Sequence, residues 1–264
     1  MDAATINKPI IAVAALVVVV AAAGFYYLRH RAVPLPTEPA PAVNTAPAEP
    51  AIAHPLPADA DASAPALPSL ADSDTPLREA LGQIAGVDAV KNYLMPENLI
   101  RRLVVTIDNL PRQKVAVERR PTPAIGAPFV AEGDELHATL DRQNFERYKP
   151  MVAVIGKLDM QKLAAVYFRF YPLLQQSYQN LGYPSGYFND RLVQVIDVML
   201  ATPQPAGPIE LVRPNVMYTY ADPALEARPA GQKLLIRMGP ENAAVIKAKL
   251  MELRAIVTAT PPKH

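Results

Sequence analysis

Hydrophobic and polar positions divide this chain of 264 residues into three parts. From Ile10 to Leu28 no residue is charged, and from Val33 to Pro76 the chain is mostly Ala and Pro. Beyond Pro76, apolar residues recur every three or four positions, which is the spacing of amphipathic helices. The pattern therefore predicts an uncharged helix, a disordered linker, and a mainly α domain with minor short β hairpins.

Within the domain, apolar spacing and helix-end signals predict a series of helices with a little β structure. The expected helices cover residues 76–86, 96–108, 144–155, 159–181, 190–199, 231–238 and 240–258. Pro172 should kink the fourth of these helices or end its first half, and Asn189 or Asp190 should cap the fifth. Alternating residues predict a short strand over 136–140, and a hairpin is expected over 209–220.

The uncharged stretch is long enough to cross a membrane. As an α-helix its 19 residues reach about 28 Å, close to the roughly 30 Å hydrocarbon thickness of a bilayer. Lys8 precedes it, Arg29 and Arg31 follow it, and Phe25–Tyr27 supply aromatic rings for the membrane interface. We expect a single-pass transmembrane anchor at residues 9–28, after a short tail of residues 1–8.

A cleaved signal peptide is the alternative interpretation of the same stretch. The triplet Ala21–Ala23 resembles a small-residue cleavage site after an apolar core. The apolar run continues through Phe25–Leu28, beyond any such site, and only Lys8 is basic before it. These features favour a retained signal anchor.

The linker and its flanking charges bear on orientation. Arg29 and Arg31 outnumber Lys8, which under the positive-inside rule places the linker (29–75) and the single domain (76–264) in the cytoplasm. An eight-residue amino end, however, leaves no functional part on its own side, and a long Ala/Pro spacer suits a domain that stands off a membrane. We expect a bacterial inner-membrane protein with a periplasmic domain; a cytoplasm-facing membrane scaffold is the alternative.

Composition excludes several classes of chemistry. The chain has no Cys, and His137 is the domain's only internal histidine, so zinc sites with paired His ligands are nearly excluded. Ser177 and Ser185 are the domain's only serines, and no Gly-rich phosphate loop occurs. From Pro76 onward the net charge is +5, well short of a nucleic-acid footprint. We expect no catalytic residue, metal, cofactor, nucleotide or nucleic-acid partner.

Carboxylates offer the one enzymatic alternative. Asp190 and Asp197 are seven residues apart, which places both on one helical face, and Glu226 is a further acid. Two carboxylates can cleave a glycosidic bond when one has a raised pKa. Asn189 and Asp190 are also natural helix caps, however, and Arg191 is a natural ion-pair partner. A glycan-acting envelope enzyme is therefore an alternative to a binding protein.

Polar clusters supply the expected binding residues. Arg101 and Arg102 lie near the basic stretch 112–120, and guanidinium groups pair well with phosphates and carboxylates. A solvated helix face is the plainer interpretation of these arginines. The other candidates lie in two polar segments and one isolated acid: Asp108, Asn109, Asn189, Asp190, Arg191 and Asp197.

Five segments of the domain, taken in order along the chain, resemble the segments of a known family. They are Leu103–Leu110, Asn144–Tyr148, Tyr171–Tyr178, Phe188–Leu192 and Gly231–Gly239. Together they resemble a proteobacterial family known only as domain of unknown function 3014, over roughly residues 76–258. The resemblance implies a short amino-terminal anchor, an Ala/Pro linker and an envelope setting, and it assigns no catalytic residue.

The leading hypothesis is a non-enzymatic, membrane-anchored protein. Its tethered domain would bind an envelope protein or cell-wall material in the periplasm, where tethering raises the local concentration of domain and target. Lys233 and Arg237, from the last of the five segments, complete the candidate binding residues.

Overall fold

The computed structural model describes residues 51–56, 66–124, 128–134 and 137–259, all within one compact unit. The predicted mainly α class is confirmed for this part of the chain. None of the described helices is long and apolar enough to cross a bilayer. The anchor expected at residues 9–28 lies outside the described residues.

Most described residues belong to helices. These are α2 (Asp74–Ala85), α3 (Val87–Tyr93), α4 (Leu99–Asn109), α5 (Gln143–Glu146), α6 (Lys149–Gly156), α7 (Met160–Gln179), α8 (Phe188–Leu200), α9 (Pro223–Glu226), α10 (Ala230–Met238) and α11 (Pro240–Val257), with a 3-10 turn η1 (Val117–Arg119). The segment α3 was not expected from the sequence; it follows α2 directly, at Gly86.

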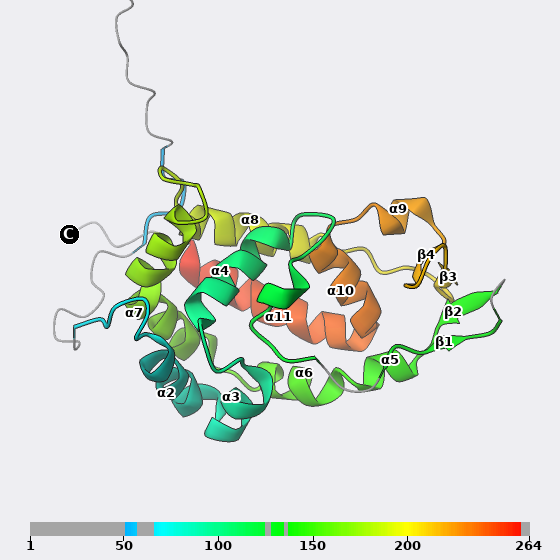
Figure 1. Cartoon of the computed structure of the whole chain (residues 1–264), viewed down its shortest axis with the longest axis horizontal. Coiled ribbons are helices and arrows are strands. Elements are labelled where there is room, and N and C mark those ends of the chain that lie inside the picture. The colour runs from blue at the N-terminus through cyan, green and yellow to red at the C-terminus, as the bar shows by residue number, and fades with distance from the viewer. Residues whose placement is uncertain (1–50, 57–65, 125–127, 135–136, 260–264) are drawn as a thin grey trace, which may run out of the picture. The chain divides into compact units, whose positions relative to one another are not determined.

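Helix α11 contacts four other described helices. It packs against α6, α7, α8 and α10, while α4 lies against α7 and α8 (Figure 1). Phe170 and Phe188 are almost completely buried between α4, α7 and α8, in one hydrophobic cluster. A second cluster, around Leu235 and Met199, joins α8 and α10 to α6 and α11.

A small antiparallel sheet lies at one end of the bundle (Figure 1). Its strands are β1 (Ala131–Glu132), β2 (Ala138–Leu140), β3 (Glu210–Val212) and β4 (Thr219–Tyr220), in that order across the sheet. The predicted hairpin of β3 and β4 is present, with Leu211 opposite Tyr220. Leu211 also pairs with Ala138, so this hairpin extends the sheet begun by β1 and β2.

Helix α7 does not end its first half at Pro172, and neither Asn189 nor Asp190 is the N-cap of α8. Helix α7 continues through Pro172. Proline lacks the N–H group of a helical hydrogen bond, and the burial of Phe170, Leu173 and Leu174 on either side compensates for that loss of stability. Asn189 and Asp190 do not cap α8; Tyr187 occupies the N-cap position without a capping side-chain bond. Both polar side chains lie inside the first turn, where they bind other segments.

Two segments with the composition of the linker lie against the helices. Leu67 and Leu70 pack against the cluster around Phe170, and the Ser73 hydroxyl donates to the Leu70 carbonyl at 2.8 Å. Residues 51–56, called the docked segment below, lie against the start of α8.

Candidate functional site

The start of α8 gathers four of the residues that the sequence singled out. Phe188 is fully buried and packs against the Tyr178 ring, with centroids 5.5 Å apart, which fixes the first turn of the helix. Successive helical residues point about 100° apart, so Asn189, Asp190 and Arg191 reach three different neighbours. Asn189 is buried in the bundle, Asp190 binds the docked segment, and Arg191 contacts Asp108 of α4.

Asp108 is a buried carboxylate, and each of its two oxygens accepts a hydrogen bond from an arginine. Arg191 donates through Nε to Asp108 Oδ1 at 3.0 Å and through Nη2 to the Asp108 carbonyl at 2.6 Å. Arg112 Nη2 donates to Oδ2 at 2.7 Å, and the Tyr183 hydroxyl lies 3.3 Å from the same oxygen. The charge of Asp108 raises the pKa of Arg112 above its ordinary value. This network fastens α4 to α8, and it leaves no free carboxylate for a ligand.

Asp190 and two neighbours hold the main chain of the docked segment. The N–H groups of Ala53 and His54 donate to the two Asp190 carboxylate oxygens at 3.0 and 2.7 Å. The Leu56 N–H donates to the Tyr187 hydroxyl at 3.1 Å, and Asn189 Nδ2 donates to the His54 carbonyl at 2.9 Å. All four contacts use backbone groups of the docked segment, so they do not depend on which side chains it carries.

Asn189 connects this site to the bundle. Its Nδ2 also donates to the Val257 carbonyl of α11 at 3.0 Å, and its Oδ1 accepts from the Tyr167 hydroxyl at 2.9 Å. The Tyr171 hydroxyl accepts from the Asn189 N–H at 3.3 Å. Burial raises the pKa of Tyr167 and of Tyr171, which keeps both hydroxyls protonated at neutral pH. The amide is therefore held in one orientation from three sides.

A hollow of about 540 Å³ borders the docked segment, lined on one side by Ala53 and His54 and on the other by α8 and α10 residues such as Val193 and Gln232. Asp197 lies at this hollow, where Arg254 Nε and Nη2 donate to its two oxygens at 2.6 and 3.1 Å. These bonds from Arg254 hold the pKa of Asp197 below its ordinary value. A segment bound to Asp190 could therefore place a side chain in this hollow.

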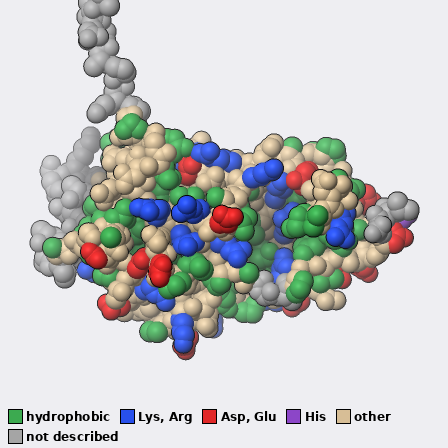
Figure 2. Space-filling model, viewed as in Figure 1, with side chains coloured by type: hydrophobic (Ala, Val, Ile, Leu, Met, Phe, Trp, Pro, Cys, Tyr) green, Lys and Arg blue, Asp and Glu red, His purple; other side chains and the backbone are tan. Residues whose placement is uncertain are grey.

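The remaining predicted residues lie elsewhere. Arg101 is exposed, and Arg102 donates to three loop carbonyls, those of Glu97, Glu118 and Arg120. Basic side chains are spread over the face shown in Figure 2, among hydrophobic and acidic ones. Arg102 thus tethers the loop after α4 rather than presenting a free cation.

Asn109, Lys233 and Arg237 also have partners within the domain. Asn109 Nδ2 donates to the Val105 carbonyl of its own helix at 2.6 Å. Lys233 Nζ pairs with Glu226 at 2.7 Å, and Arg237 lies over the Tyr220 ring, 5.4 Å from its centroid. The two basic residues of α10 therefore stabilise its contacts with α9 and with strand β4.

The candidate carboxylates do not have the properties of a glycosidase pair. Asp190 accepts from the docked segment, and Asp197 has a lowered pKa. Burial raises the pKa of Glu226, but the bonds from Lys233 and from the Tyr220 N–H outweigh burial and leave it lowered. A general acid needs a raised pKa, so these contacts do not favour the enzymatic alternative. No group of three or more His, Asp or Glu in the described ranges could hold a metal ion.

Sequence reasoning missed the occupant of the site. The docked segment has the Ala/Pro composition of its surroundings, and only Ile52, His54 and Leu56 interrupt it. Tyr187 was not among the predicted binding residues, although its hydroxyl is a ligand of the docked segment. A main-chain contact leaves no residue pattern that a sequence would reveal.

Comparison with known proteins identifies a family match that covers most of the described helices. The model of a family described as "Protein of unknown function (DUF3014)" matches residues 99–254, from the first residue of α4 into the last turn of α11. No curated protein matched the chain, and no solved structure did. The matched region contains Tyr187, Asn189 and Asp190, while the docked segment lies outside it.

Proposed function

Because this chain belongs to the DUF3014 family, whose description names no activity, we propose its function from the site itself. The protein is a membrane-anchored interaction domain that binds a segment of an envelope partner at the start of α8. The single observation behind this proposal is that Tyr187, Asn189 and Asp190 bind four main-chain groups of the docked segment.

Main-chain recognition supports a binding role over a purely structural one. A carboxylate accepts two successive N–H groups, and an amide donates to the carbonyl that follows them. Such contacts select a backbone conformation and do not depend on the side chains of the bound segment. The acceptor residues lie within the family match and the occupant lies outside it. A partner segment of similar backbone shape can therefore take the place of residues 51–56.

The membrane setting of the proposal comes from the sequence. The uncharged residues 10–28 supply the anchor, and the Ala/Pro stretch supplies a spacer. We place the anchor in a bacterial inner membrane and the domain in the periplasm, where the partner is an envelope protein or cell-wall material. The domain acts as a scaffold, without a catalytic step.

The binding test uses a labelled hexapeptide with the sequence of residues 51–56, and the full chain in phosphatidylcholine nanodiscs. The double variant Ala53→Pro/His54→Pro removes both N–H donors that reach Asp190, so it frees the site without altering it. We expect this variant to bind the peptide at least tenfold more tightly than the wild type, measured by fluorescence anisotropy.

Asp190→Ala in the same background should weaken peptide binding at least tenfold, because hydrogen bonds to a charged acceptor are the strongest contacts of the site. Asp88→Ala, at an exposed acid of α3, is the matched control and should leave binding unchanged. A freed site that binds no better than the wild type would show that it accepts only its covalently attached neighbour, and the proposed function would be rejected.

The membrane orientation is tested with reporters fused after His264. A reporter that is active only outside the cytoplasm should be active, and one that fluoresces only inside should stay dark. The reverse result would place the domain in the cytoplasm, as the charges of Arg29 and Arg31 favour, and would replace the envelope partner by a cytosolic one.

A further inference from the structure

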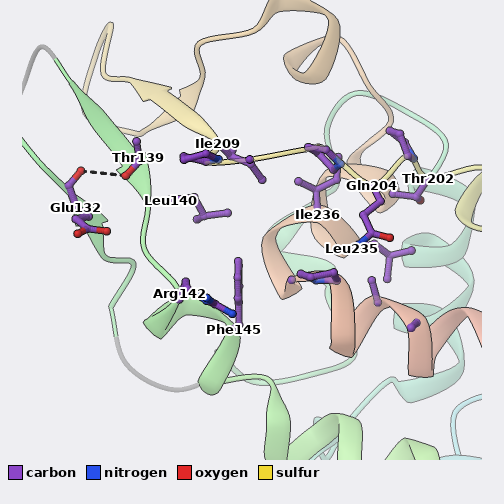
Figure 3. Close-up of a pocket in the computed structure, with 18 of the residues that line it drawn as sticks. Glu132, Thr139, Leu140, Arg142, Phe145, Thr202, Gln204, Ile209, Leu235 and Ile236 are labelled. Atoms are coloured by element: carbon purple, nitrogen blue, oxygen red, sulfur yellow. Dashed lines mark hydrogen bonds between the residues drawn. The ribbon is translucent and has the colours of Figure 1, made fainter.

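A second cavity, of about 790 Å³, lies between the sheet and the bundle, away from α8 (Figure 3). Its volume falls within the range of small-molecule sites, roughly 300–1,000 Å³. Strand β2 and helix α5 form one wall, and the junction of α10 with α11 forms another. The loop of residues 202–209 closes a third side with Pro203, Pro205 and Pro208.

The interior of this cavity is apolar. Leu140, Phe145, Ile209 and Ile236 surround a shared space, and Leu235 lies beside Ile236 (Figure 3). Gly239, between α10 and α11, has φ of +83°, and a Cβ there would collide with the Phe145 ring at 2.5 Å. A glycine is therefore required for Phe145 to lie against the helix junction and form part of the cavity wall.

The lining of the cavity also carries more positive than negative side chains. Arg142, at the start of α5, is exposed and forms no ion pair with any described residue. Lys247 of α11 donates to the Thr202 carbonyl at 2.5 Å and likewise has no carboxylate partner within the described ranges. Glu132 of β1 is the one carboxylate among the described residues that line the cavity. An apolar interior with a cation that has no described carboxylate partner, Arg142, suits a ligand that is apolar along its body and anionic at one end.

We propose that this cavity binds an amphiphilic anion of the fatty-acid type, with its acyl chain among Leu140, Phe145 and Ile236 and its acidic group near Arg142. This proposal goes beyond the binding of a partner segment, because it involves none of the residues at the start of α8. The same chemistry is available from a free fatty acid and from an anionic phospholipid.

The probe is dansyl-undecanoic acid, whose emission rises when it enters an apolar site, and its uncharged amide is the matched probe. The full chain is held in phosphatidylcholine nanodiscs, and empty nanodiscs supply the background. Ala244→Trp fills the cavity from α11, while Ala248→Trp, one turn further along and outside the cavity lining, is the matched variant. We expect saturable binding of the acid to the wild type and to A248W, and a loss of at least tenfold in A244W.

The charge requirement is tested at Arg142. Arg142→Gln should weaken binding of the acid about three- to tenfold and leave binding of the amide unchanged, and Arg119→Gln at an exposed site of η1 should change neither. Displacement by oleate alone would identify a free fatty acid as the ligand, and displacement by phosphatidylglycerol added to the nanodiscs would identify a lipid. The proposal is overturned if neither displaces the probe, if A244W binds like A248W, or if R142Q affects acid and amide equally.

Discussion

Two ion pairs in this domain have the same chemistry and differ in how much water surrounds them. The Asp108 side chain is 5 % exposed and its partner Arg191 17 %, whereas Asp197 and Arg254 are 49 % and 39 % exposed. Water can replace a lost partner at the exposed pair. At the buried pair it cannot, and the remaining charge stays uncompensated.

Asp108→Asn should therefore lower the free energy of unfolding by about 3 kcal/mol, because Arg191 keeps its charge in a largely desolvated place. Asp197→Asn should lower it by less than about 1 kcal/mol. Thermal unfolding of the full chain, followed by circular dichroism, measures both changes. Equal decreases in the unfolding temperature would contradict this assignment of burial.

At the scale of elements, helix positions could be predicted because each helix carries its own apolar stripe. The contacts between elements could not, since they join residues far apart in sequence: Arg191 and Asp108 are 83 positions apart, and Asp190 and His54 are 136 apart. Asp74 illustrates the difference. It is the first residue of α2, but its carboxylate accepts from the N–H groups of Asn98 and Leu99, both at 2.7 Å.

Asp74 thus caps α4 from a neighbouring helix. Asp74→Ala should leave the first N–H groups of α4 without this acceptor and cost about 1–2 kcal/mol of stability. For a domain of this size the unfolding temperature should fall by roughly 2–8 °C. Asp88→Ala, an exposed acid in the first turn of α3, should produce no comparable change. If both variants unfold at the same temperature as the wild type, the capping role of Asp74 is wrong.

The candidate site shows the same limit of prediction. Asp108, Asn189, Asp190 and Arg191 were predicted as binding residues, and the fold brings all four together at α8. Their roles were not predictable, because a cap, an ion pair and a peptide ligand use the same side chains. Arg142 and Lys247 were not identified at all, since nothing in a single sequence indicates that an exposed arginine faces a cavity.

At the scale of the whole molecule, buried hydroxyls tie stability to alkaline pH. Burial raises the pKa of Tyr167, Tyr171 and Tyr178, and it raises the pKa of Tyr220 to about 12. An acid whose pKa is higher in the folded state than in the unfolded state favours folding fully below its unfolded pKa, near 10. That contribution is lost as the pH rises from about 10 toward 12.

The chain has eleven Tyr and no Trp, so absorbance near 295 nm reports only tyrosinate. We expect exposed tyrosines to ionise near pH 10, and the buried ones to ionise only at higher pH, together with loss of the helical circular dichroism signal. In concentrated guanidinium chloride all eleven should ionise in one step near pH 10. A single step at that pH with the helical signal intact would contradict the burial of these hydroxyls.

The docked segment also determines where mechanical force would act. It lies between the amino-terminal part of the chain and the helices, so tension from that side reaches the hydrogen bonds at Asp190 and Tyr187 before it reaches Leu67 and α2. Those few surface bonds break at lower force than a buried core, and their rupture frees roughly 45 Å of additional chain. The start of α8 would then be free of the docked segment and exposed to solvent. A pull on the chain and the arrival of a partner would consequently open the same site.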